Sequence, residues 1–139
     1  MAENGNQLME ELEALYVRAE HWSSDYAFLE DEFRFLINLA DKYFISIVLS
    51  DSERLNKLKS IAKELSRLDD EREQIASENK KHLAYLARLI KNEEAFDPEG
   101  CRERQSDIES DHIAFFKKYR SIKARLFNLS EEIFKSNGN

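Results

Sequence analysis

Residues 108–133 of the chain read IESDHIAFFKKYRSIKARLFNLSEEI. Alternating steps of four and three residues through this stretch meet an almost unbroken series of apolar side chains. Residues three and four apart lie on the same side of an α-helix, so the series predicts a long helix with one apolar seam. The seam contains Ile108, His112, Phe115, Tyr119, Ile122, Leu126, Leu129 and Ile133. Of these, only the histidine titrates near neutral pH.

Two seams of the same spacing precede this stretch, and together the three predict helices over residues 7–49, 52–93 and 101–135. Ser50 with Glu53 three residues later is typical of a capping box, and Pro98 with Gly100 indicates a turn over residues 96–100. The first seam contains Leu8, Leu12, Leu15, Ala19, Trp22, Tyr26, Leu29, Phe33, Leu36, Ala40, Tyr43 and Ile47. The second contains Leu58, Ile61, Leu65, Leu68, Arg72, Ile75, Asn79, His82, Leu86 and Leu89.

The composition favours long helices with solvated outer faces. The chain has 139 residues, of which 42% are apolar and 35% charged, and it contains only three glycines and one proline. This length suits one domain with its own core, and short connections make neighbouring helices antiparallel. We therefore predict a single all-α domain over residues 1–139, an elongated antiparallel three-helix bundle with coiled-coil-like heptad seams.

Charge and cysteine content narrow the class of partner. The net charge is −7 and the pI is near 5.1, and we expect acidic neighbours beside each run of Lys and Arg, which argues against nucleic acid. The longest apolar run, residues 43–49, is far shorter than the roughly 20 residues that a membrane span needs. With a single cysteine, Cys101, and no secretory signal in the first residues, we expect a cytoplasmic protein without a membrane partner.

Aromatic residues outside the seams suggest a second contact surface. Phe28 and Phe35 lie seven residues apart in the first helix, and Phe116 and Phe127 lie beside the third seam. Each helix of a three-helix bundle touches two neighbours, so one interpretation is that these rings widen the internal seams. The alternative is that they form an interface in a homodimer or with another helical protein, because exposed Phe side chains invite association.

The histidines give the only indication of chemistry. If the second turn is centred near Pro98, antiparallel pairing places His82 level with His112, with Glu109 and Glu78 close by. Imidazoles and carboxylates on facing helices bind divalent transition metals. Glu109 and His112 have the Glu-x-x-His spacing of ferritin-like di-iron bundles, although the second such motif and the fourth helix are absent. The alternatives are structural histidines bonded within the core, or a pair that destabilises the fold when protonated.

No catalytic motif accompanies these features. The chain lacks a glycine-rich phosphate loop, and no histidine is placed to act as a base for Cys101. We therefore expect a structural or protein-interaction module without a cofactor, which self-associates and is not an enzyme. The alternative is a helical-bundle protein that binds a divalent transition metal through His82, His112, Glu109 and Glu78.

Overall fold

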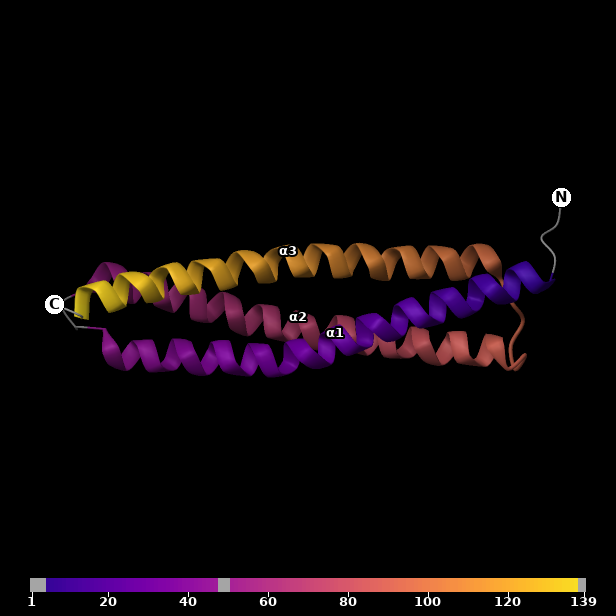
Figure 1. Ribbon diagram of the computed structural model, residues 1–139, viewed down its shortest axis with the longest axis horizontal. Helices are drawn as coiled ribbons and strands as arrows, with labels where there is room; N and C mark the ends of the chain where they lie inside the picture. The colour runs from indigo at the N-terminus through magenta and orange to yellow at the C-terminus, as the bar shows by residue number, and fades with distance from the viewer. Residues whose placement is uncertain (1–4, 48–50, 138–139) are drawn as a thin grey trace. The chain divides into compact units, whose positions relative to one another are not determined.

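Three long helices make up almost all of the computed structural model, which describes residues 5–47 and 51–137. They are α1 (Gly5–Ser46), α2 (Ser52–Ile90) and α3 (Pro98–Asn137), and Figure 1 follows them in chain order from indigo to yellow. Each helix packs against the other two, and the described residues contain no strand. The protein is an all-α three-helix bundle, as predicted. Within the described ranges, none of these helices carries an apolar stretch long enough to cross a bilayer.

The core follows the predicted seams closely. Every seam position of α2 from Leu58 to Leu89 is buried, including the polar residues Arg72, Asn79 and His82. On α1 the seam is buried at all positions except Leu8 and Leu15, and on α3 at all except His112. The four-three alternation therefore identifies the buried stripe of each helix, as expected for apolar residues that stack on one side.

Aspartate caps begin the second and third helices. Asp51 accepts a hydrogen bond from the backbone N–H of Arg54 at 3.3 Å, and Asp97 accepts one from that of Gly100 at 3.1 Å. In both cases the carboxylate satisfies the amide three residues later, which has no partner inside the helix. The predicted capping residue Ser50 lies outside the described residues, as do residues 48 and 49 at the predicted end of the first helix.

The connection between α2 and α3 differs from the prediction. Asn92 has a φ of 60°, and the N–H groups of Asn92 and Glu93 donate to the carbonyls of Leu89 and Arg88 at 3.1 and 2.9 Å, which is a Schellman ending. Pro98 is the first residue of α3 and not the centre of a turn. Proline suits this position because its missing N–H would have had no helical partner.

All three helices contribute to each of two compact units. Unit 1 comprises Met1–Phe28 and Glu73–Ile113, and unit 2 comprises Leu29–Arg72 and Ala114–Asn139. In unit 1, α1 runs parallel to α3, because Glu11 pairs with Arg102 and, seven residues later, Arg18 pairs with Glu109. In unit 2, α2 runs antiparallel to α3, because its ion pairs join Glu71 to Lys118 and Glu64 to Arg125. The assignment of residues 1–139 to one domain stays a prediction.

The predicted register between the second and third helices is wrong by one to two helical turns. In unit 1 the partner of His82 is Gln105, which lies seven residues before His112. The error comes from Pro98, because a turn centred on this residue makes α2 too long and moves every facing residue of α3 toward the C-terminus.

Candidate functional site

His82 forms one end of a polar chain through the core of unit 1, with Gln105 at its centre. Its side chain is 1% exposed, and its Nε2 lies 2.5 Å from Oε1 of Gln105. The side-chain amide nitrogen of Gln105 in turn donates a hydrogen bond to the backbone carbonyl of Leu15 at 3.2 Å. Because Oε1 of Gln105 can only accept, the ring nitrogen Nε2 of His82 carries the proton and donates it. The chain thus joins one group from each of the three helices.

Two buried acceptor atoms lie on the same side of α2. Asn79 donates through Nδ2 to the carbonyl of Ala19 at 2.8 Å, which leaves its Oδ1 without a partner among the described residues. Nδ1 of His82 is likewise buried without a partner in the part of the chain that the structure describes. An unmatched buried acceptor costs on the order of 1–3 kcal/mol. Both acceptors lie beside the chain that joins Leu15, Gln105 and His82.

His112 belongs to a separate aromatic cluster against α1. Its Nδ1 lies 2.8 Å from the hydroxyl of Tyr26, and its ring centroid lies 5.6 Å from that of Trp22. Oδ2 of Asp25 lies 3.8 Å from Nε2. The side chain is 15% exposed, so it reaches the edge of the core. His82 and His112 lie at different levels of unit 1, because His82 is bonded to Gln105, which precedes His112 by seven residues on α3.

Burial lowers the pKa of both histidines. For His82 the cause is desolvation, which outweighs the hydrogen bond to Gln105, and the guanidinium of Arg104 lowers the pKa further. For His112 desolvation also dominates, and the nearby carboxylates of Asp25 and Glu109 offset it only in part. Both imidazoles are therefore held in the neutral form to a lower pH than a solvated histidine.

Each of the two glutamates predicted as metal ligands lies near a different histidine, Glu109 near His112 and Glu78 near His82. Glu109 pairs with Arg18 at 2.7 Å on the α1 side of α3. Glu78 is exposed and lines, together with His82, a hollow of about 230 Å³ between α2 and α3 that also contains charged side chains of both signs. No group of three or more potential metal ligands occurs within residues 5–47 and 51–137. Metal binding by these side chains stays a prediction.

The four phenylalanines predicted for an interface differ in exposure. Phe28 in unit 1 is 63% exposed, and in unit 2 Phe35 is 55% and Phe127 38% exposed. Phe116 is half-buried, and its ring packs edge-on against those of Phe115 and Tyr119. Phe116 therefore belongs partly to the core, whereas the other three rings are open to solvent.

An ion pair in unit 2 places the exposed rings of α1 and α3 on one side. Nζ of Lys123 lies 2.6 Å from Oε1 of Glu32, and the hydroxyl of Tyr119 donates to the same oxygen at 2.8 Å. These contacts hold the pKa of Glu32 below its ordinary value. Phe35 follows Glu32 by three residues, and Nζ of Lys123 lies 5.8 Å from the ring centroid of Phe127. Both rings thus border the same ion pair.

Phe134 extends this surface along α3. It follows Phe127 by seven residues, is 64% exposed, and contacts the ring of Tyr43 on α1 at a centroid distance of 6.1 Å. Residues seven apart lie on nearly the same side of a helix. We call the surface formed by Phe35, Phe127 and Phe134 the aromatic face of unit 2.

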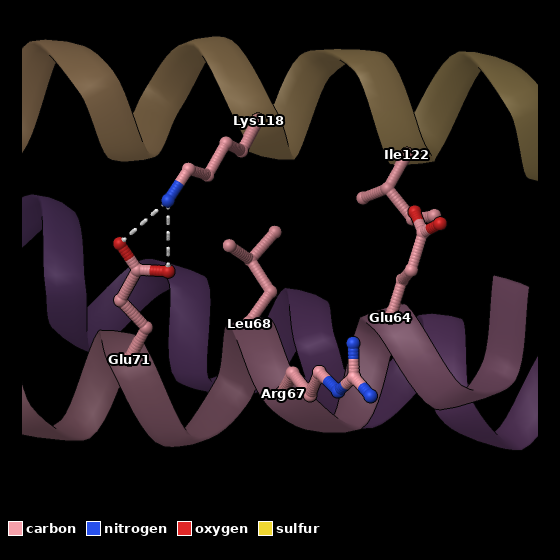
Figure 2. A pocket seen from close by; sticks show the side chains of 6 residues that line it. All are labelled: Glu64, Arg67, Leu68, Glu71, Lys118 and Ile122. Atoms are coloured by element: carbon pink, nitrogen blue, oxygen red, sulfur yellow. Dashed lines mark hydrogen bonds and ion pairs between the residues drawn. The ribbon is translucent and has the colours of Figure 1, made fainter.

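The groove on the α2–α3 side of unit 2 is lined by charged side chains, unlike the aromatic face. Its lining includes the buried side chains of Leu68 and Ile122, and its volume is about 230 Å³. Figure 2 shows Nζ of Lys118 facing both carboxylate oxygens of Glu71, at 3.2 and 3.3 Å. A second lining carboxylate, that of Glu64, is paired with Arg125. Most of the charge around this groove is therefore neutralised by partners on the facing helix.

Sequence reasoning missed two features of α3. Gln105 and Cys101 are buried and continue the four-three alternation upstream of Ile108, so extending the seam backwards would have found them. The expectation of acidic neighbours beside each basic run is wrong for residues 112–130, which contain five cations and no carboxylate. Counting charges separately along each helix would have found this stretch.

Comparison with known proteins adds no relative. The chain matches no protein family, and neither a characterised protein nor a solved structure is significantly similar to it. A functional assignment therefore depends on the chain's own surface.

Proposed function

We propose that this protein is an interaction module of the cytoplasm that self-associates through the aromatic face of unit 2. The observation that carries the proposal is the grouping of Phe35, Phe127 and Phe134 on one side, beside seams that are already filled by buried residues. A single exposed apolar side chain is ordinary on a protein surface. Three exposed phenylalanines, two of them beside one ion pair, form a patch of the kind that marks an interaction site.

Much of the apolar area of the aromatic face remains in water. Fully burying a Phe side chain contributes on the order of 1.5–3 kcal/mol, and Phe35 and Phe134 each keep more than half of their surface exposed. A partner that covered the face would recover part of this free energy for each of three rings. Aromatic residues are also enriched in the centres of protein interfaces, where they are depleted of water.

The burial of the single cysteine supports the cytoplasmic location in this proposal. Cys101 is the only cysteine of the chain, and its thiol is fully buried against the core of unit 1. Burial also raises the pKa of the thiol, which disfavours the reactive thiolate. A buried, inert thiol in a chain without a disulfide suits a reducing environment such as the cytoplasm.

The proposal is tested by measuring the mass of the wild-type protein by sedimentation velocity over a concentration range of about 1–500 µM. We expect a concentration-dependent dimer. The double variant Phe35→Gln, Phe127→Gln should raise the dissociation constant by at least about tenfold, since it removes two of the exposed rings. The matched control is Val17→Gln in unit 1, whose side chain is 53% exposed and lies outside the aromatic face.

A wild-type protein that stays monomeric at the highest concentration contradicts the proposal. It is contradicted equally if the control variant weakens association as much as the double variant does. Circular dichroism of both variants verifies that helix content is unchanged, so that a loss of association is not a loss of folding.

A further inference from the structure

The charges of α3 are divided between the two units. In the part of the helix that belongs to unit 1, residues 98–111 contain five carboxylates and two arginines. In the part that belongs to unit 2, residues 114–130 contain five cations and no carboxylate. A division of this kind along one helix provides both halves of an electrostatically complementary contact.

Only some of the cations in unit 2 are neutralised by the fold. Lys118, Lys123 and Arg125 pair with carboxylates of α1 and α2. Lys117 and Arg120 are exposed and form no ion pair within the residues that the structure describes. Arg120 precedes Phe127 by seven residues, so the two lie on nearly the same side of α3. We call Lys117 and Arg120 the basic strip, and it continues the aromatic face along the helix.

The exterior of α3 in unit 1 has the opposite charge. Its two arginines face other helices, because Arg102 pairs with Glu11 and Arg104 lies over the ring of Tyr85 at 4.6 Å. Glu103 and Asp107 are exposed, lie one turn apart and form no ion pair in the described ranges. We call these two residues the acidic strip.

We infer that the basic strip and aromatic face of one copy bind the acidic strip of a second copy. This inference rests on the proposed self-association and specifies which surface the aromatic face meets. The paired side chains would be exposed cations against exposed carboxylates around apolar contacts, as in a typical interface with a polar rim. An anionic membrane is the less favoured partner, because three of the five cations are already neutralised and the net charge of −7 repels such a surface.

The experiment compares the self-association of charge-reversed variants. Lys117→Glu with Arg120→Glu should raise the dissociation constant by about tenfold, and wild-type association should weaken as sodium chloride rises from about 0.05 to 0.5 M. The matched control is Lys59→Glu with Lys63→Glu on α2, which changes the net charge equally at two exposed lysines that form no ion pair in the described part of the chain. The control should change the dissociation constant by less than about threefold.

Reversal of both strips should restore binding. The variant Glu103→Lys, Asp107→Lys should also associate weakly by itself. Mixed with Lys117→Glu, Arg120→Glu, it should form a heterodimer close to wild-type affinity, because each reversed strip then meets a complementary one. Restoration on mixing is a result that a general loss of folding in either variant would not produce.

Two results overturn the inference, and they differ from each other. If the basic-strip variant behaves like the control while Phe35→Gln, Phe127→Gln still abolishes the dimer, self-association stands and the charged strips have no part in it. If the wild-type protein is monomeric and cosediments with phosphatidylserine vesicles, the second copy is the wrong partner and the proposed self-association fails with it.

Discussion

Mild acidification should destabilise unit 1, because unit 1 holds two histidines whose burial disfavours protonation. The folded-state pKa of both His82 and His112 lies below the ordinary value of 6.5. The unfolded chain therefore takes up protons first as the pH falls through 6.5, and protonation favours unfolding. The contribution of the two neutral histidines to the free energy of unfolding is fully present above pH 6.5. It is lost progressively as the pH falls from 6.5 toward their folded-state pKa values.

The size of the effect has an upper limit set by the unfolded state. One pH unit below 6.5, each histidine can cost at most about 1.4 kcal/mol, so both together cost at most about 2.8 kcal/mol at pH 5.5. Paired carboxylates act in a different range. The folded-state pKa values of Glu11, Glu32 and Asp51 are lowered from 4.5, 4.5 and 3.8, so their contribution is lost only at lower pH.

Urea unfolding at about pH 7.5, 6.5 and 5.5 measures this loss directly. The variant His82→Gln, His112→Gln should show a much smaller change in unfolding free energy over this range, whereas the exposed His21→Gln should behave like the wild type. The reasoning is refuted if the double variant loses as much stability between pH 7.5 and 5.5 as the wild type does. An unchanged wild-type stability would refute it as well.

Two further predictions concern the third helix and the metal hypothesis. Asp97→Ala should lower the unfolding free energy by about 1 kcal/mol, because it removes the carboxylate that accepts from Gly100, and Asp97→Asn should restore most of the loss in thermal melts. Added zinc, iron(II) or manganese should leave the melting temperature unchanged, because no group of three potential ligands lies within residues 5–47 and 51–137. A rise in melting temperature that disappears in His82→Ala, His112→Ala would instead establish a metal site.

The helices were predictable because their seams are long and regular. Over residues 58–89 the spacing alone picks out Arg72, Asn79 and His82 as buried, although each of them is polar. The exact pairing of helices was not predictable, because it depends on where a connection ends. Pro98 can belong to a turn or to the first position of a helix, and the two choices move α3 by one to two turns against α2.

The candidate surfaces were predictable only in part. Phe28 and Phe35 are exposed as an interface requires, but Phe116 lies close enough to the seam for its ring to pack against Tyr119. The hydrogen-bond partner of His82 could not be predicted from the sequence. Gln105 lies on another helix, so the pairing depends on how α2 and α3 align and not on a fixed spacing along the chain. Ion pairs between helices, such as that of Glu64 with Arg125, also depend on this alignment and could not be predicted.

The chain of bonds from Leu15 through Gln105 to His82 also bears on how the protein avoids misfolding. Apolar seams that repeat every seven residues fit one another almost as well after a slip of one heptad. Such a slip would separate the buried imidazole from the amide and leave both unbonded, at a cost on the order of 1–3 kcal/mol for each group. The hydrogen bonds that join Leu15, Gln105 and His82 therefore favour the native alignment of the helices in unit 1 over an alignment shifted by one heptad.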